Sequence, residues 1–140
     1  MTFAGVNYLA IIAAAVASWL VGAAWYMAFA KPWMAARGWA SKEEMVAQQG
    51  KPSPVPFVIS FVAELVMAWT LAGVIGHAGP VTVVNGLISG SLVWLGFVAT
   101  TMVVNHGFGG QKPALTVIDG GHWLAVLLVQ GAIIGWMGPG

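Results

Sequence analysis

Hydrophobic residues are concentrated in four long runs, at residues 5–29, 55–76, 81–104 and 114–137. A helix needs roughly 20 mainly apolar residues to cross a bilayer, and each run is long enough. The runs are rich in Ala, Leu and Gly and do not alternate strictly between polar and apolar residues, which favours helices over buried strands. Turn-forming residues separate the later runs, at Gly79-Pro80 and between Gly107 and Pro113. The pattern predicts an all-α, polytopic membrane protein with a four-transmembrane-helix bundle.

The segment between the first two runs, residues 30–54, is the only sizeable part of the chain outside them. Ser41 followed by Glu44 matches a capping box, and Gly50 before Pro52 is a stop signal. We therefore expect a short helix near Lys42 to Gln49. Three tryptophans next to it are expected to anchor the chain at the membrane interface or to contact a partner: Trp25, Trp33 and Trp39.

Composition supports a membrane location. Of the 140 residues, 59% are hydrophobic and 6% are charged, whereas a soluble domain has roughly 25% charged residues. The length indicates one membrane domain over residues 1–140. Cysteine is absent, which excludes disulfides and thiolate metal sites. The net charge of +1 argues against nucleic acid as a partner, since binding it requires a concentrated basic face. The expected partner is the lipid bilayer.

The distribution of basic residues predicts the orientation. All five lie in the first and third loops, at Lys31, Arg37, Lys42, Lys51 and Lys112. With four spans these two loops share one side of the membrane, and the positive-inside rule makes that side cytoplasmic. Both termini are then expected to be periplasmic or extracellular. The first run is expected to remain as a span, because no basic residue precedes it and it is longer than the apolar part of a signal peptide.

Ionisable residues within the runs are the main candidates for function. Glu64 lies about nine residues into the second run, which is about 14 Å and near the middle of the bilayer core. Asp119 and His122 lie in the fourth run and are three residues apart, so they share a helix face. A central carboxylate costs roughly 2.5–3.5 kcal/mol to insert. These side chains should therefore face other helices or a water-filled cavity.

Other polar residues near the same side could join them. The expected polar cluster consists of Glu64, Asp119, His122, Asn105, Thr101 and Tyr26. Three interpretations are open: a structural hydrogen-bond network, a proton or ion pathway, or a metal site in the bundle. The candidate metal ligands are Glu64, His106, Asp119 and His122. A second carboxylate-x-x-His motif is missing from the sequence, so no metal and no cofactor are predicted.

Two pairs of glycines have the spacing that allows close helix packing in membranes, Gly86 with Gly90 and Gly131 with Gly135. They serve either packing within the bundle or self-association into a homo-oligomer. Both uses are open at the level of the sequence.

The chain resembles an uncharacterised bacterial membrane family called domain of unknown function 1761. The resemblance lies in three segments: Trp25-Tyr26 with Phe29, Lys31 and Trp33; Trp94 to Val98 with Thr100, Thr101 and Asn105; and Asp119 to His122 with Gly131 to Gly135. Met27-Ala28 departs from the Ser-Pro expected after the Trp-Tyr pair. The resemblance implies the four-span topology and a bacterial cytoplasmic (inner) membrane. It implies no activity, because the family has no assigned one.

Two functions remain as expectations. The first is a small oligomeric transporter or channel that moves protons, ions or a small solute through the polar cluster. The alternative is a structural or accessory subunit of a larger membrane complex without transport activity of its own. An enzyme is not expected, because the sequence contains no nucleophile elbow, phosphate-binding loop or zinc-protease motif.

Overall fold

The computed structural model describes residues 5–140, and these form helices without any strand. Three spans are single helices: α1 (Tyr8–Ala28), α4 (Val55–Ala78) and α7 (Pro113–Met137). The remaining span is continuous through α5 (Val83–Val93), the π-helical segment η1 (Trp94–Ala99) and α6 (Thr100–Phe108). In this part of the chain, four helices are long and apolar enough to cross a membrane. The all-α, four-span prediction is confirmed.

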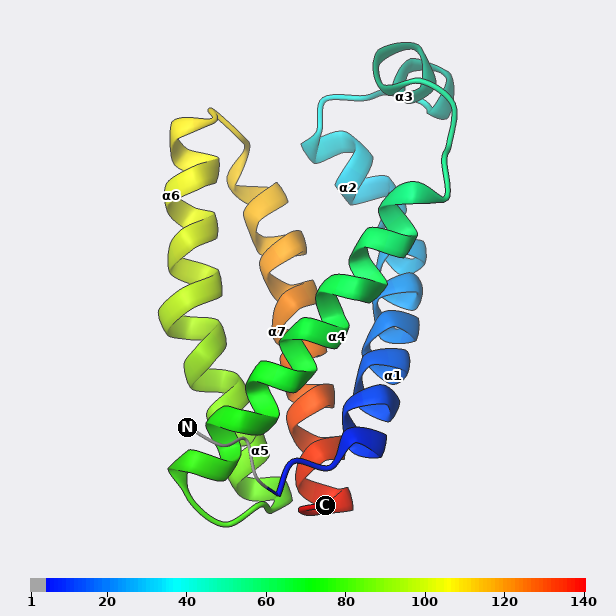
Figure 1. Cartoon of the computed structure of the whole chain (residues 1–140). Helices are drawn as coiled ribbons and strands as arrows, with labels where there is room; N and C mark the ends of the chain where they lie inside the picture. Colours follow the sequence, from blue (N-terminus) through cyan, green and yellow to red (C-terminus); the bar gives the residue numbers. More distant parts are fainter. Residues whose placement is uncertain (1–4) are drawn as a thin grey trace.

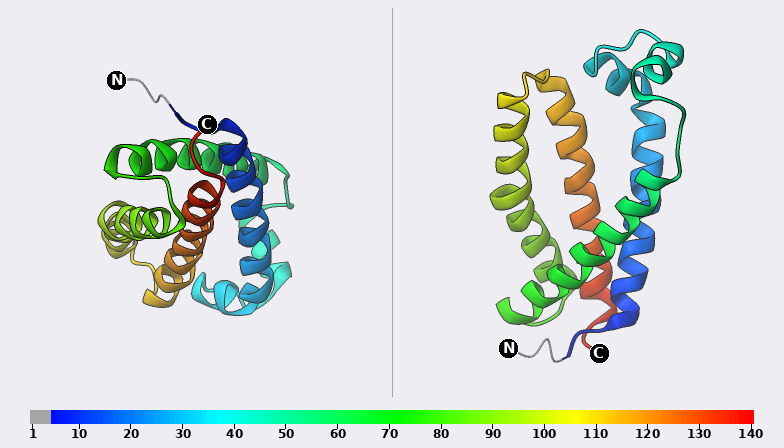
Figure 2. Two further views of the ribbon diagram at one scale, coloured as in Figure 1. Left: turned by 90° about the horizontal axis from the view of Figure 1, so that it is seen from below. Right: turned by 45° about the horizontal axis from the view of Figure 1, so that its top comes forward.

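The spans form an antiparallel bundle with α7 at its centre, as Figure 1 shows. Helix α7 contacts α1, α4, α5, η1 and α6. The two ends of the described chain lie on one side, where the Gly140 amide donates a 2.9 Å hydrogen bond to the Gly5 carbonyl. We call this the terminal side. The opposite side, the loop side, contains the segment between α1 and α4 and the turn between α6 and α7 (Figure 2).

The third span ends later than the sequence pattern predicts. Gly107 marks the expected turn, but α6 continues to Phe108 and ends in a Schellman motif. The Gln111 amide donates to the His106 carbonyl at 2.9 Å, and the Gly110 amide donates to the Gly107 carbonyl at 3.2 Å. Gly110 has a φ of +67°, a conformation that glycine adopts readily, so it determines where the helix stops.

Helix α1 has small residues on its inner face and large ones on its outer face. The inner residues recur every four positions and are buried, at Ala10, Ala14, Ser18 and Gly22. The large exposed residues are Leu9, Ile12, Val16 and Leu20. Small side chains let neighbouring helices approach closely, while large apolar side chains are stable against lipid. This distribution is the one expected of a helix in a bilayer.

The four predicted packing glycines all lie between α5 and α7. A Cβ atom on Gly86 would overlap the backbone carbonyl of Gly131, and a Cβ on Gly131 would overlap that of Gly86. A Cβ on Gly90 would lie 2.7 Å from the Leu127 carbonyl oxygen, and one on Gly135 would overlap the Thr82 carbonyl. The structure therefore places these glycines in packing within the chain.

The loop side contains two short helices, α2 (Ala30–Ala36) and α3 (Lys42–Gln49). Helix α3 has the predicted bounds, and the Ser41 hydroxyl accepts a 3.2 Å hydrogen bond from the Glu44 amide. Helix α2 was not predicted. Pro32 explains its separation from α1, because proline lacks an amide hydrogen and its ring would clash with the carbonyl four residues earlier, at Ala28.

Candidate functional site: a polar groove between α1, α4 and α7

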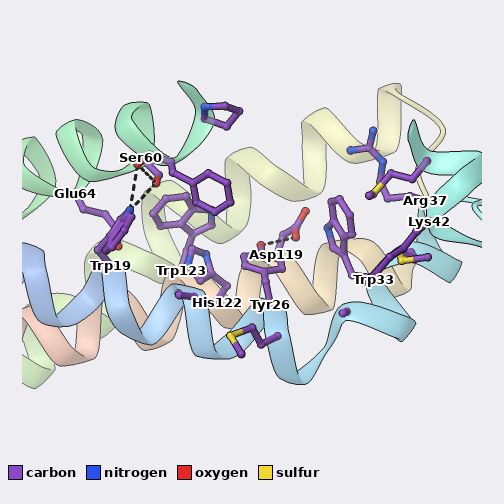
Figure 3. A pocket seen from close by; sticks show the side chains of 18 residues that line it. Trp19, Tyr26, Trp33, Arg37, Lys42, Ser60, Glu64, Asp119, His122 and Trp123 are labelled. Carbon is purple, nitrogen blue, oxygen red and sulfur yellow. Dashed lines mark hydrogen bonds between the residues drawn. The ribbon is translucent and has the colours of Figure 1, made fainter. Parts of the chain in front are cut away.

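A cavity of about 720 Å³ lies among α1, α4, α7 and the two short loop-side helices. We call it the groove. Figure 3 shows Arg37 and Lys42 at one end, Glu64 with Trp19 at the other, and Asp119 and His122 between them. Its walls are mostly apolar and aromatic. Because Glu64 is near the middle of the second span, the groove extends from the loop side to about the centre of the membrane.

The deep end of the groove is built around Glu64, which is 2% exposed. The Ser18 hydroxyl lies within hydrogen-bond reach of the Glu64 carboxyl and is 3.2 Å from the Ala15 carbonyl oxygen. Its single proton therefore serves only one of these two acceptors at a time. The Glu64 atom Oε1 has no hydrogen-bond partner among the described residues.

Gln130 ties the three helices together directly beside this carboxyl. Its Nε2 donates to the Ser18 hydroxyl on α1 and to the Glu64 backbone carbonyl on α4, each at 3.0 Å. Gln130 is fully buried, and its Oε1 has no partner within residues 5–140. The deep end is thus held in place by one amide group but keeps unused hydrogen-bonding capacity.

The middle of the groove contains Tyr26, Asp119 and His122. The Tyr26 hydroxyl donates a 2.6 Å hydrogen bond to Asp119 Oδ1. The Tyr26 ring packs on the His122 ring with 4.9 Å between centroids. His122 fits because Gly22 has no side chain: a Cβ there would lie 2.8 Å from His122 Nε2. His122 Nδ1 is buried and has no partner in the described chain.

Two tryptophans fix the part of α7 that presents Asp119 and His122. Trp25 Nε1 donates to the Ile118 carbonyl at 3.1 Å, and Trp94 Nε1 donates to the Gly120 carbonyl at 2.8 Å. Each carbonyl thereby accepts a hydrogen bond from a neighbouring span, which restricts rotation of α7 at this level. Trp25, predicted as an interface anchor, thus contributes to packing inside the bundle.

The mouth of the groove is formed by stacked side chains of the loop. The Arg37 guanidinium lies 5.6 Å from the Trp33 ring and 4.7 Å from the Trp39 ring. Trp39 is 5% exposed and its Nε1 donates to Gln48 Oε1 at 2.7 Å. Both predicted anchors therefore hold Arg37 at the loop side, and Trp39 also joins the segment after α2 to α3.

Thr101 and Asn105 do not reach the groove, so the expectation that they join the cluster does not hold. Both are exposed on α6. The Thr101 hydroxyl donates to the Phe97 carbonyl of its own helix at 2.5 Å, and the neighbouring Thr100 bonds Gly96 in the same way. The physical reason is the position of the third span. It packs on α7, and none of its residues lines the groove.

The four candidate metal ligands do not converge either. His106 Nδ1 lies 2.8 Å from the Thr116 hydroxyl at the loop-side end of α6 and α7. Within the described chain, no group of three or more His, Cys, Asp and Glu side chains could hold a metal ion.

Sequence reasoning missed several residues of this site, among them Ser18, Trp19, Gly22 and Trp123. For Ser18 and Gly22 a signal was present, because they continue the four-residue spacing of small residues along α1. Trp19 and Trp123 have no such signal. Aromatic residues in an apolar span are as compatible with a lipid-facing position as with a cavity.

Comparison with known proteins places the chain in a family without giving it an activity. Neither the curated proteins nor the solved structures yield a match. A family model described as "Protein of unknown function (DUF1761)" matches residues 9–135, which include most of all four spans. The resemblance inferred from the three sequence segments is thereby confirmed. The chain belongs to the DUF1761 family.

Proposed function

We propose that this chain is a small transporter that acts in a bacterial cytoplasmic membrane, with the loop side cytoplasmic and both termini periplasmic. It takes a proton, an ion or a small solute from the loop side into the groove, where Glu64, Asp119 and His122 bind it. The observation that supports this most directly is that the groove reaches a buried carboxylate near the middle of the membrane.

The unpartnered atoms of the cluster favour a binding site over a purely structural network. Buried polar groups in a network that only fixes packing are almost always hydrogen-bonded, because an unpaired one costs about 1–3 kcal/mol. Three buried side-chain atoms of the described residues have no partner: Glu64 Oε1, His122 Nδ1 and Gln130 Oε1. All three belong to the same small region, and Glu64 and His122 line the groove.

The terminal half of the bundle favours a transporter over an open channel. Beyond Glu64 the helices are packed by a cluster of buried apolar side chains: Ile11, Ala14, Ala68, Leu71, Ala72, Ile75, Leu127 and Ile134. The groove is therefore a site reached from one side. Transport then requires the helices to move so that the site faces the other side.

A second copy of the chain is part of the proposal. Only 11% of the third span is buried within the chain, against 33–39% of the other three. A homo-oligomer would cover this face. The same observation favours the alternative function, an accessory subunit that places this span against a partner protein in a larger complex.

Flux measurements in proteoliposomes test the proposal. We expect the wild-type protein to dissipate a gradient of protons or common cations faster than protein-free liposomes do. Glu64→Gln should lower this rate by roughly tenfold or more, because it removes the ionisable group in the middle of the path. Glu43→Gln is the matched control, since Glu43 lies in α3 outside the spans, and it should leave the rate unchanged.

Two results would contradict transport. Wild-type protein with no flux above protein-free liposomes removes transport of protons and common cations, and so does equal flux from wild type and Glu64→Gln. The accessory-subunit alternative predicts the first of these, together with co-purification of one fixed partner in constant ratio.

A further inference from the structure

The deep and middle parts of the groove contain two carboxyl groups and neither a lysine nor an arginine side chain. Glu64 and Asp119 line it, and the two basic side chains of the lining, Arg37 and Lys42, are at the opposite end near the loop side (Figure 3). Arg37 is exposed and its guanidinium stacks on two tryptophans. An ionised carboxylate in a low-dielectric site needs a compensating charge, and no lysine or arginine lies in this part of the groove.

Aromatic rings line the groove, and one of them lies beside the deep carboxyl. Trp19 is fixed beside Glu64 because its Nε1 donates to the Phe57 carbonyl and to the Ser60 hydroxyl, each at 3.1 Å. Tyr26, Phe57 and Trp123 also line the groove. The face of an aromatic ring attracts a cation, and the attraction is larger when the cation is desolvated. Rings and carboxylates together are the chemistry that recognises an organic cation.

The basic mouth does not reverse this preference. Charges at the membrane surface are in contact with water and counterions, which screen them within about 8 Å at physiological salt. Two charges attract several times more strongly at the low effective dielectric of a buried site than in water. The Glu64 carboxylate at the deep end therefore outweighs Arg37 and Lys42 for any ligand bound next to it.

The groove is also accessible to a lipophilic ligand. Two of its lining residues, Met27 on α1 and Phe57 on α4, are 79% and 60% exposed on the sides of the spans. In a bilayer these positions face acyl chains. A lipophilic molecule dissolved in the bilayer therefore meets apolar lining residues of the groove at the surface of the bundle.

We propose that the groove binds an aromatic, lipophilic organic monocation with its charged centre at Glu64, and that this cation and a proton compete for the Glu64 carboxyl. When the cation binds, the carboxyl releases its proton to water in the groove and the carboxylate pairs with the cation. When a proton returns, the cation is released. The claim that this cation is transported rests on the proposed function. The claim that it binds in the groove does not.

Other titratable groups share the groove with Glu64. They are Tyr26 from α1, Asp119 and His122 from α7, and Arg37 and Lys42 at the mouth. Asp119 already accepts the Tyr26 hydroxyl, while Glu64 has one unpartnered oxygen. Glu64 is the more deeply buried of the two carboxyls, and its unpartnered oxygen is buried, so the proton competition is assigned to it.

The test uses two ions of nearly equal size and opposite charge, tetraphenylphosphonium and tetraphenylborate. Each is equilibrated with purified full-length protein in nanodiscs of zwitterionic lipid, and binding to protein-free nanodiscs is subtracted. We expect saturable binding of the phosphonium ion and none of the borate. Phosphonium affinity should fall as the pH is lowered, and a weakly buffered sample should release protons when the phosphonium ion binds.

Variants locate the site. Glu64→Gln should weaken phosphonium binding by roughly tenfold or more and abolish the pH dependence and the proton release. Glu64→Asp keeps the charge and should restore both in part, which separates loss of charge from loss of folding. Glu43→Gln should bind like the wild type.

Each contrary result has a distinct meaning. Preferential binding of the borate ion, or phosphonium binding that Glu64→Gln does not change, would overturn the inference. Absence of binding while liposomes show Glu64-dependent flux also overturns it and leaves the proposed function standing. Binding that depends on Glu64 in a protein without flux supports the inference and removes transport of protons and common cations.

Discussion

At the scale of the residue, the groove depends on a small number of close contacts that hold charged side chains in an apolar environment. Asp119 is held by the Tyr26 hydroxyl at 2.6 Å. The Tyr26 ring also lies against His122. Tyr26 therefore positions two of the three ionisable side chains with one ring and one hydroxyl, and its two contributions can be separated by removing the hydroxyl alone.

We predict that Tyr26→Phe lowers the free energy of unfolding by about 1–3 kcal/mol, because the Asp119 carboxyl inside the bundle loses its hydrogen-bond donor. The ring packing on His122 is retained in this variant. Reversible unfolding in mixed micelles measures the change. The matched control is Tyr8→Phe, since Tyr8 is 66% exposed and should change stability by less than about 0.5 kcal/mol. Equal stability of the two variants would mean that the Asp119 bond contributes nothing.

The convergence of Tyr26, Glu64, Asp119 and His122 in one groove could be predicted from depth in the membrane and helical spacing. The exclusion of Thr101 could not. It depends on which side of α7 the third span packs, and depth and helical spacing do not specify that. Ser18 and Gln130 were harder to assign for a different reason. Their hydrogen bonds join residues 112 and 66 positions apart in the chain, which only the packed bundle brings together.

At the scale of the element, the contact between α5 and α7 determines where the whole third span lies. Gly86 and Gly131 place two backbones in direct contact. The sequence motif predicted close packing but left the partner helix open, since the same spacing serves contacts within a chain and between chains. The structure also shows why η1 is tolerated: the hydroxyls of Thr100 and Thr101 donate to carbonyls of the π-helical segment, and backbone groups in a bilayer must be paired within the protein.

We predict that Gly86→Ala destabilises the fold by about 1–3 kcal/mol, the usual cost of overpacking, because the new Cβ meets a backbone carbonyl and not a flexible side chain. Gly96→Ala is the matched control. A Cβ there has no atom within 4 Å, so this variant should be neutral or more stable by up to about 1 kcal/mol. The measurement is again unfolding in mixed micelles. A stable Gly86→Ala protein would show that the two backbones can separate at no cost.

At the scale of the whole molecule, the two ends of the bundle differ. The terminal side is packed by the apolar core cluster, and the ends of the described chain are hydrogen-bonded to each other there. The loop side contains the groove and its basic mouth. The four-span fold could be predicted from hydrophobic pattern alone, because each run is long enough to cross the bilayer. The groove could not, since it depends on how far the spans separate on the loop side.

The central claim is that the groove connects the loop side to the buried carboxyl at the middle of the membrane. The absence of cysteine from the chain allows a direct measurement, in which single cysteines are tested for reaction with a positively charged, membrane-impermeant thiol reagent applied to either side. Ser60→Cys and Ala23→Cys place the thiol in the groove lining. Leu20→Cys, on the exposed outer face of α1, and Ala68→Cys, in the buried core, are the controls.

We predict that Ser60→Cys and Ala23→Cys react from the loop side and not from the terminal side, and that neither control reacts from either side. If the side from which the groove cysteines react is the inner side of the membrane, the same result also places the loop side in the cytoplasm. Protection of both groove cysteines from both sides, or reaction from the terminal side alone, would contradict the account.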